Sequence, residues 1–213
     1  LVRRSYDAPL ETATTNILGT AHVLEALRQN EIDCPVVVVT SDKCYENDGT
    51  SRAFSETDTL GGHDIYSASK AAVEIMTRSW QRAFKGRIAT ARAGNVIGGG
   101  DYGVDRIVPD CVRALETGES IAVRSPDATR PWQHVLDCLS GYLWLGACLA
   151  HDDSLADAFN FGPEPEPQRP VRELVEQFLQ HWPGEWNDAS DPNPPHEAAT
   201  LSLAIDKARQ QLG

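Results

Sequence analysis

Apolar residues along this chain follow two spacings, one typical of helices and one typical of buried strands. Between Glu11 and Asn30 they recur every three or four residues, which predicts a helix. The run from Cys34 to Thr40 is continuous and β-branched, which predicts a strand of a parallel sheet covered on both faces. A second helix over 66–84 and a second strand over 87–93 repeat the succession. Strand, helix and strand in this order predict a right-handed parallel crossover in an α/β fold.

The second half of the chain is less regular. The pattern predicts short strands and helices in turn, namely helices over 105–116, 136–150, 171–182 and 204–212 and strands over 120–124, 132–135 and 158–162. The longest apolar stretch, Leu139 to Ala150, spans 12 residues. A membrane span needs about 20, so this stretch predicts a buried helix and no membrane association.

Composition excludes several classes of protein. Lys and Arg number 19 against 31 Asp and Glu, and the net charge of −12 without a basic run argues against nucleic acid as a partner. The five cysteines have no CxxC spacing and no His-rich cluster beside them, so we expect reduced core thiols, no metal site and a cytoplasmic protein. The first residues carry no apolar targeting core, and Met76 is the only methionine. We therefore expect Leu1 to be an internal residue of a longer protein.

Residues with reactive side chains follow the first predicted strand and open the second helix. Open parallel sheets bind ligands at the carboxyl ends of their strands, where Ser41, Asp42 and Lys43 present a hydroxyl, a carboxylic acid and an amine. The alternative is a polar loop in which Asp42 bonds backbone amides. Tyr66 and Lys70 are four residues apart, on one helix face. An ammonium beside a phenol lowers the Tyr pKa and favours acid or base chemistry, although chance gives roughly one such pair in ten chains of this composition.

Six motifs together resemble the extended short-chain dehydrogenase/reductases, the NAD-dependent epimerase/dehydratase family, in order and spacing. They are Thr-Ser-Asp-Lys-Cys-Tyr-Glu-Asn (40–47), Tyr-Ser-Ala-Ser-Lys (66–70), Ala-Arg-Ala-Gly-Asn-Val-Ile-Gly-Gly-Gly-Asp (91–101), Arg-Pro-Trp-Gln-His-Val (130–135), Phe-Asn-Phe-Gly-Pro (159–163) and Pro-His-Glu-Ala (195–198). Lys43, the triple glycine and the last motif favour the branch that acts on CDP-glucose over the branch that acts on dTDP-glucose, which usually has Glu in place of Lys43. Tyr102 and Ala68 depart from the usual Trp and Ser without removing a reactive group.

The resemblance implies a Rossmann-like, doubly wound parallel sheet that lacks its first βαβ units, with a smaller C-terminal substrate-binding subdomain. Residues 1–97, joined by 136–162, would form the C-terminal part of the NAD-binding domain. Residues 98–135 and 163–213 would form the nucleotide-sugar-binding subdomain. In this family a Gly-rich turn near the start holds the NAD pyrophosphate at a helix end. We find no such turn ahead of the first predicted strand, so we expect a chain that lacks most of its cofactor site and is inactive by itself.

The resemblance also implies a reaction, the NAD-dependent dehydration of CDP-D-glucose to CDP-4-keto-6-deoxy-D-glucose, a step toward the deoxysugars of lipopolysaccharide. A hydride leaves C4, water is eliminated across C5 and C6, and the hydride returns to C6. Tyr66 would remove the 4-hydroxyl proton, Lys70 would tune Tyr66 and hold the nicotinamide ribose, and Ser41 would orient the hydroxyl. Asp42 would be the acid toward the departing 6-hydroxyl, and Lys43 the base or its electrostatic aid at C5.

Further positions are assigned to binding. Ala93 belongs to the cofactor side of the site, and Asn95, Arg106 and Arg130 are expected to grip the nucleotide diphosphate, because a guanidinium donates two parallel hydrogen bonds to phosphate. A surface ion pair is an equal alternative for Arg106 and a weaker one for Arg130, and His196 is assigned to the same cleft with less weight.

Three interpretations from different classes remain. The first is the CDP-glucose dehydratase. The second is a related nucleotide-sugar epimerase, reductase or dTDP-glucose dehydratase; an epimerase has no elimination to catalyse and no need for Asp42 and Lys43. The third is a non-catalytic nucleotide-sugar-binding fragment. The expected partner is a nucleotide sugar, and family members are commonly homodimers or homotetramers when complete.

Overall fold

A three-stranded parallel sheet carries the first part of the chain. The computed structural model describes residues 2–47, 49, 52–164, 169–192 and 201–213. Its strands run in the order β1 (Val36–Val39), β2 (Ile88–Ala93) and β6 (Ala158–Phe161), which confirms the predicted parallel arrangement. The central strand β2 is buried along its whole length. β1 lies at the edge, and Val39 is 47% exposed, so the expectation that this strand is covered on both faces is wrong at its carboxyl end.

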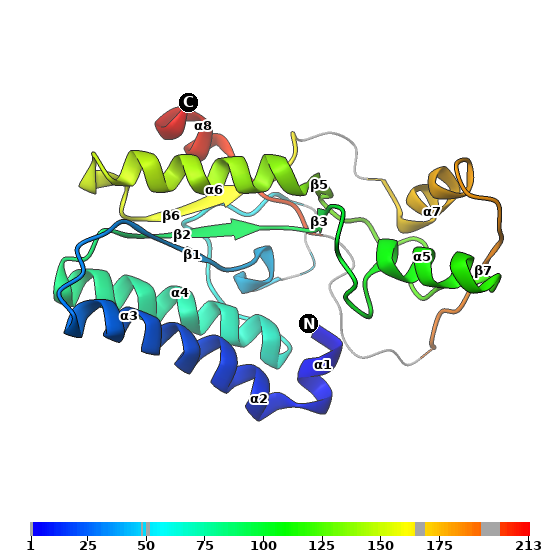
Figure 1. Ribbon diagram of the computed structural model, residues 1–213, viewed down its shortest axis with the longest axis horizontal. Helices are drawn as coiled ribbons and strands as arrows, with labels where there is room; N and C mark the ends of the chain where they lie inside the picture. Colours follow the sequence, from blue (N-terminus) through cyan, green and yellow to red (C-terminus); the bar gives the residue numbers. More distant parts are fainter. Residues whose placement is uncertain (1, 48, 50–51, 165–168, 193–200) are drawn as a thin grey trace.

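Helices cover the two faces of the sheet (Figure 1). The long helix α4 (Ile65–Phe84) and α3 (Gly19–Gln29) lie on one face, and α6 (Val135–Leu149) and α8 (Asp206–Leu212) lie on the other. An apolar cluster fills the space between the sheet and α6, and its buried members are Ala89, Ala91, Leu145, Leu149, Leu155 and Phe159. Burial of such side chains is the main favourable contribution to this packing.

One flank of α6 contradicts the expected buried helix. Leu136 and Leu143 are 66% and 76% exposed, whereas Leu145 and Leu149 are fully buried. The helix is apolar nearly all round, but the three-stranded sheet beneath it covers only one side, so the opposite side is left in contact with solvent.

The N-terminal helices follow one another almost without a break. They are α1 (Val2–Asp7), α2 (Pro9–Ala13), a π-helical turn η1 (Thr14–Leu18) and α3, so the helix expected over 11–30 begins two residues early. Pro9 suits the first turn of α2, because a proline has no amide proton to leave unsatisfied there. In η1, Asn16 Nδ2 donates to Ser69 Oγ on α4 at 2.9 Å, which ties the two helices together.

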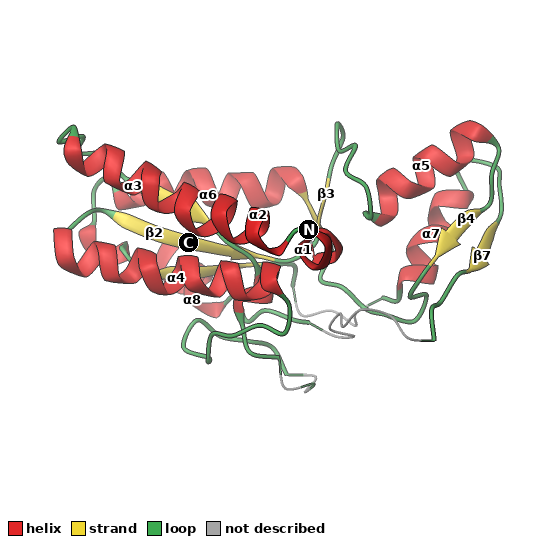
Figure 2. Ribbon diagram, turned by 90° about the horizontal axis from the view of Figure 1, so that it is seen from below, coloured by secondary structure: helices red, strands yellow, loops and turns green. Residues whose placement is uncertain are grey.

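A second group of elements lies at one end of the molecule, beyond the carboxyl ends of the strands (Figure 2). It contains α5 (Ile107–Thr117), α7 (Val171–Leu179) and a parallel pair of short strands, β4 (Ile121–Val123) and β7 (Trp186–Asp188). Its core is Cys111, Leu115, Ile121, Val123 and Val175. A second short parallel pair, β3 (Val96–Ile97) and β5 (Gln133–His134), connects this group to the sheet. The described residues also contain the single 3-10 turns η2 (Asp42–Cys44) and η3 (Asp153–Leu155).

The segment from Leu201 to Ile205 returns to the sheet. Leu201 and Leu203 pack with Tyr45 and Phe54 of the loop after β1. Backbone bonds reinforce the contact, since Phe54 N donates to the Ser202 carbonyl and Ala204 N donates to the Phe54 carbonyl, both at 2.8 Å. The last residues therefore contribute to the core beneath β1 and β6.

Two expectations about composition can be compared with the structure. All five cysteines are free thiols, with Cys44, Cys111 and Cys138 buried and Cys34 and Cys148 partly buried, which confirms their assignment as packed thiols. Within the described ranges, none of the helices combines the length and the apolar character needed to cross a membrane.

Candidate functional site

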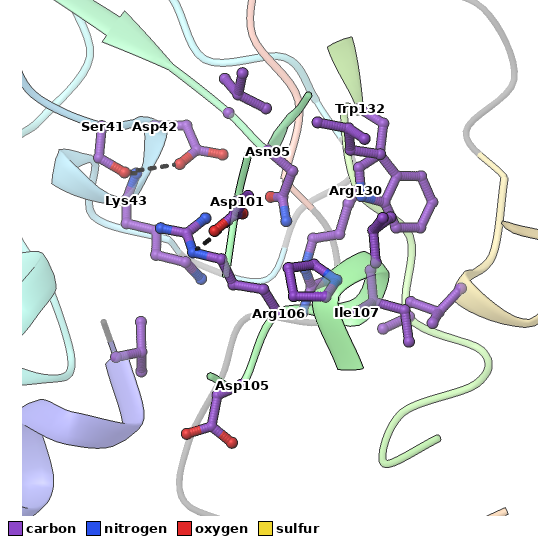
Figure 3. A pocket seen from close by; sticks show the side chains of 18 of the residues that line it. Ser41, Asp42, Lys43, Asn95, Asp101, Asp105, Arg106, Ile107, Arg130 and Trp132 are labelled. Carbon is purple, nitrogen blue, oxygen red and sulfur yellow. Dashed lines mark hydrogen bonds and ion pairs between the residues drawn. The ribbon is translucent and has the colours of Figure 1, made fainter. Parts of the chain in front are cut away.

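A cleft of about 380 Å³ lies where the carboxyl ends of β1 and β2 face the second group of elements. Figure 3 shows Ser41, Asp42 and Lys43 on one side of this cleft and Ile107, Arg130 and Trp132 on the other. The position agrees with the expectation that ligands bind outside the carboxyl ends of parallel strands.

The 3-10 turn η2 places the first three candidate residues. Ser41 is its N-cap, and its Oγ accepts a bond from Lys43 N at 3.2 Å and donates to Asp42 Oδ1 at 3.0 Å. Ser41 and Asp42 are 6% and 3% exposed. Burial is the main influence on the Asp42 carboxyl and raises its pKa, although Lys43, Ser41 and Arg130 act in the opposite direction. A raised pKa favours the protonated form of the carboxyl, which is the form that donates a proton.

Helix α4 brings Tyr66 into the lining of the cleft and places Lys70 behind it, in contact with Val39, which lines the cleft. The Asp64 side chain caps this helix by accepting from Ser67 N at 2.9 Å, which fixes the turn that carries Tyr66. Lys70 Nζ donates to the Val39 carbonyl at 3.2 Å and lies 6.0 Å from the centre of the Tyr66 ring. The two side chains therefore meet as the four-residue spacing predicts.

The pKa of Tyr66 differs from the expectation. Burial raises it, as does the charge of Asp42, while a hydrogen bond with Ser41 and the charge of Arg106 lower it, with a net increase. Burial likewise lowers the pKa of Lys70. In this structure the shift of Tyr66 toward neutrality predicted from Lys70 alone is not observed, because desolvation of the phenol outweighs the cations.

A glycine allows the chain to pass close to Asp42. A Cβ built on Gly94 would lie 2.6 Å from Pro131 Cγ and 3.1 Å from Asp42 Oδ2, so a side chain at this position would displace the carboxyl or the proline. Gly94 follows β2 directly and keeps the ends of β1 and β2 and the loop at 131 in contact around the acid.

The residues expected to hold phosphate line the same cleft. Asn95 lies between the two walls in Figure 3. Arg106 Nε lies 3.9 Å from Asp101 Oδ2, and its side chain is 49% exposed, so the alternative of an ion pair is realised alongside its position in the cleft. Arg130 Nη1 donates to the Thr129 carbonyl at 2.8 Å, and its charge reaches Asp42.

Two other candidates have different outcomes. Ala93, at the end of β2, is 7% exposed and lines the cleft beside the catalytic candidates. His196 lies outside the described residues, so its assignment stays a prediction. Among the residues that the structure describes, no cluster of His, Cys, Asp and Glu could hold a metal ion.

The structure adds cleft residues that sequence reasoning missed. Arg124 forms an ion pair with Asp105, whose backbone is in the left-handed region at φ 61°, and Asp105 Oδ1 also lies 3.8 Å from Arg3 Nε. Trp132 and Tyr142 also line the cleft. Trp132 lies in the motif over 130–135, so the sequence could have identified it as a cleft residue. Arg3, Arg124 and Tyr142 come from segments that only the fold brings together.

A buried polar network beneath the cleft was also missed. Arg92 is fully buried, and its Nη2 donates to Glu74 Oε2 at 2.7 Å. Arg92 Nη1 donates to Tyr45 Oη at 2.8 Å, and Tyr45 donates to Asn160 Oδ1 at 2.7 Å. Glu74 stands four residues after Lys70, a spacing that could have singled it out as a residue on the same helix face.

Comparison with known proteins agrees with this geometry. The model of the NAD dependent epimerase/dehydratase family matches residues 1–162. The CDP-glucose 4,6-dehydratase of Salmonella typhimurium is 39% identical over 227 residues, which cover 100% of this chain and 62% of that relative. The dTDP-glucose 4,6-dehydratase of Mycolicibacterium smegmatis is 29% identical over 58% of this chain and 37% of its own length. The chain thus spans less than two thirds of these curated relatives.

Solved structures share the fold. The dTDP-glucose 4,6-dehydratase from Streptomyces venezuelae, solved with NAD and TYD bound, superposes with a TM-score of 0.88 at 22% identity, covering 100% of this chain and 64% of that one. The UDP-glucose 4-epimerase from Thermotoga maritima, solved with UDP-glucose, gives 0.85 at 20% identity, covering 99% and 67%. With a family model that covers residues 1–162 and a fold common to dehydratases and epimerases, the chain belongs to the NAD dependent epimerase/dehydratase family.

Proposed function

We propose that this chain carries the acid–base groups and the nucleotide-sugar cleft of an NAD-dependent hydro-lyase that converts CDP-D-glucose to CDP-4-keto-6-deoxy-D-glucose. The observation that carries the proposal is the buried Asp42 carboxyl beside Lys43, in a cleft that Ser41 and Tyr66 also line, with Lys70 next to Tyr66. An oxidoreductase or epimerase of this family needs the hydroxyl, phenol and ammonium. Only an elimination also needs an acid and a base next to them.

The elimination assigns separate tasks to Asp42 and Lys43. A ketone at C4 makes the C5 proton acidic, so Lys43 in its uncharged form accepts that proton, and the ammonium that results stabilises the enolate. Asp42 donates its proton to the 6-hydroxyl, which leaves as water. The raised pKa of Asp42 supports this role, because the acid must still hold its proton when the substrate arrives.

Tyr66 accepts the proton of the substrate 4-hydroxyl, and Ser41 orients that hydroxyl through its own. Arg106 lowers the pKa of Tyr66, and burial of the ring opposes it, so a bound cofactor and substrate must supply further stabilisation of the phenolate. NAD, when bound, supplies the hydride acceptor at C4 and the donor at C6.

The described residues fit one end of that cofactor. Lys70 Nζ has three donors and uses one for the exposed carbonyl of Val39, which leaves donors for the hydroxyls of a nicotinamide ribose beside Ala93. For the pyrophosphate, the described residues offer no comparable fit. Gly98, Gly100 and Gly103 have the spacing GxGxxG, but α5 begins only at Ile107, so these glycines do not form the tight strand-to-helix turn that holds phosphates.

The cations of the cleft fit a diphosphate. Arg106 and Arg130 both line the cleft, in a chain whose net charge is −12. A planar guanidinium binds phosphate with two parallel bonds, which makes these two arginines the residues of choice for the CDP group, with Asn95 between them and the sugar.

The remaining assignments also belong to the proposal. Residues 1–97 and 136–162 would form the cofactor-side domain and 98–135 and 163–213 the substrate-side subdomain, whose last part, from Leu201 through α8, packs on the former. The complete protein would be a cytoplasmic homodimer or homotetramer that supplies a deoxysugar precursor of lipopolysaccharide.

Calorimetric titration of the 213-residue chain with CDP-glucose, dTDP-glucose and NAD tests the proposal. We expect binding of CDP-glucose, at least tenfold weaker binding of dTDP-glucose and no saturation with NAD. Arg130→Gln should abolish CDP-glucose binding, whereas Arg172→Gln, which alters an exposed ion pair with Asp127, should leave it unchanged. Preference for dTDP-glucose would move the chain to that branch. Absence of binding to either sugar nucleotide would contradict the proposal.

A further inference from the structure

Glu74 is a buried carboxylate to which the proposed chemistry assigns no task. Its residue is 3% exposed, and both of its oxygens are occupied. Oε1 accepts from Thr40 Oγ1, and Oε2 accepts from Thr90 Oγ1 and from Arg92 Nη2, each of the last two at 2.7 Å. A single side chain therefore joins α4 to the end of β1 and to two residues within β2.

The partners of Glu74 lie next to the reactive residues. Thr40 directly precedes Ser41, and Glu74 stands one helical turn beyond Lys70 on the same face of α4. Together with the bond from Lys70 to the Val39 carbonyl, the helix is attached to the β1 end at two successive residues. Sliding or rotation of α4 would break both attachments and move Tyr66 away from Ser41.

We propose that Glu74 is the positioning residue of this site, a clamp that fixes the distance between the Tyr66–Lys70 pair and the Ser41–Lys43 turn. The inference rests on the proposed function for the reaction it serves, but the clamp itself is a property of the free chain. Arg92 offsets the cost of burying the carboxylate and is held in turn by Tyr45.

An ion pair suits positioning better than apolar contacts do. Apolar side chains of equal volume often stabilise a core as well as a buried ion pair does. Apolar contacts have no preferred direction, however, so they do not fix the rotation of a helix as hydrogen bonds do. The Glu74 charge has a second effect, since it raises the pKa of Lys70 against the larger effect of burial and favours the ammonium form beside Tyr66.

Two threonines of the same chain give a matched pair of variants. Thr40→Val removes the hydroxyl that Glu74 binds and keeps the Glu74–Arg92 pair. Thr77→Val is the control, because Thr77 lies on the same helix at 2% exposure and its Oγ1 has no hydrogen-bond partner among the described residues. Thr40→Ser keeps the hydroxyl and should behave as the parent does. Glu74→Gln keeps the volume and removes the charge.

The readouts are local and come from NMR of the unliganded chain. The pKa of Lys70 is followed by ¹³C-dimethylation of the four lysines, assigned with Lys70→Arg, and amide hydrogen exchange is measured at positions 40 and 44. Thr40 N donates to the Ala91 carbonyl and Cys44 N to the Ser41 carbonyl, so both amides report the strand end. We expect Thr40→Val to accelerate exchange at both amides at least tenfold, and Glu74→Gln to lower the Lys70 pKa.

Other outcomes overturn the clamp. Exchange at positions 40 and 44 that is equal in Thr40→Val and Thr77→Val would show that Thr40 holds nothing in place. Acceleration spread evenly over β2 and β6 would indicate a general loss of stability instead of a local role. If Thr40→Val does not fold, exchange at positions 40 and 44 in Glu74→Gln decides instead, and rates equal to those of Thr77→Val would reject the proposal. CDP-glucose titration of the parent tests the proposed function separately, so either can fail without the other.

Discussion

Tyr45→Phe removes one oxygen atom from the buried network and leaves the aromatic ring. The ring stacks on Phe54 at 5.2 Å between centroids, and the Arg92 guanidinium lies 5.0 Å from its centre, contacts that phenylalanine keeps. The hydroxyl accepts from Arg92 at 2.8 Å and donates to Asn160 at 2.7 Å, contacts that phenylalanine loses. A bond to a charged donor contributes roughly 1.5–3 kcal/mol and a neutral one roughly 0.5–1.5 kcal/mol. Because Arg92 Nη1 keeps a second acceptor in the Glu56 carbonyl at 3.2 Å, we expect a loss of about 2–3 kcal/mol in the free energy of unfolding.

Equilibrium unfolding in urea, followed by far-UV circular dichroism, measures this loss as a lower midpoint at an unchanged slope. Tyr102→Phe is the matched control, since Tyr102 is 85% exposed, and its variant should stay within about 0.5 kcal/mol of the parent. A loss below about 1 kcal/mol for Tyr45→Phe at equal slope would refute the reasoning, because the two bonds would then stabilise the fold no more than bonds to water do.

Three further changes have expected outcomes. Gly94→Ala should cost about 1–3 kcal/mol of stability through the clash with Pro131 and should weaken CDP-glucose binding. Gly99→Ala is the control, because the space around its Cβ is open, and it should have neither effect. Equal behaviour of the two variants in urea unfolding and in calorimetry would count against the close approach of the chain at Gly94. The hydrogen bond from Arg52 holds the pKa of Asp58 at about 2, below the ordinary 3.8. The stabilisation that the Asp58 carboxylate gives the fold is therefore complete above pH 3.8 and is lost as the pH falls toward 2. Asp58→Asn should flatten the acid-unfolding curve between these two pH values. Burial raises the pKa of the Cys111 thiol to about 11, so alkylation of the native chain at pH 8, read by peptide mass spectrometry, should label Cys111 well after the partly buried Cys34 and Cys148, and early labelling would contradict its burial.

Local pattern was sufficient for most of the main sheet and its helices. The continuous valines of β1 and the helical spacing over 66–84 predicted elements within a few residues of those observed, because hydrophobic period and burial coincide there. The strand β7 escaped prediction, since Trp186–Asp188 is only three residues long and is a strand only through its pairing with β4. The exposure of the outer flank of α6 could not be predicted either. The sequence shows that this helix is apolar, but it does not show how many strands lie beneath it.

The candidate site, like the fold, was predictable from the sequence only in part. Ser41, Asp42, Lys43, Tyr66 and Lys70 were predictable because two short motifs carry them to strand and helix ends that share one edge of the sheet. The pKa of Tyr66 was not, since it depends on burial by residues from distant segments. In the sequence, nothing distinguishes Arg92 from the other residues of its predicted strand. Only the fold shows that its partners come from α4 and from the loop after β1.

The return of residues 201–205 to the sheet sets an order on biosynthesis. Asn160 Nδ2 donates to the Ala204 carbonyl at 3.0 Å, and Phe54 exchanges backbone bonds with Ser202 and Ala204. The ribosome adds 44 residues (204 − 160) between those two positions, which takes roughly 2–9 s at about 5–20 residues per second. Throughout that interval the nascent chain already contains β1, β2 and β6, yet the amide of Asn160 and the peptide groups of Phe54 still lack these acceptors and donors. The contacts that close the core around Phe54 and Asn160 therefore form late in translation, after β1, β2 and β6 have been made.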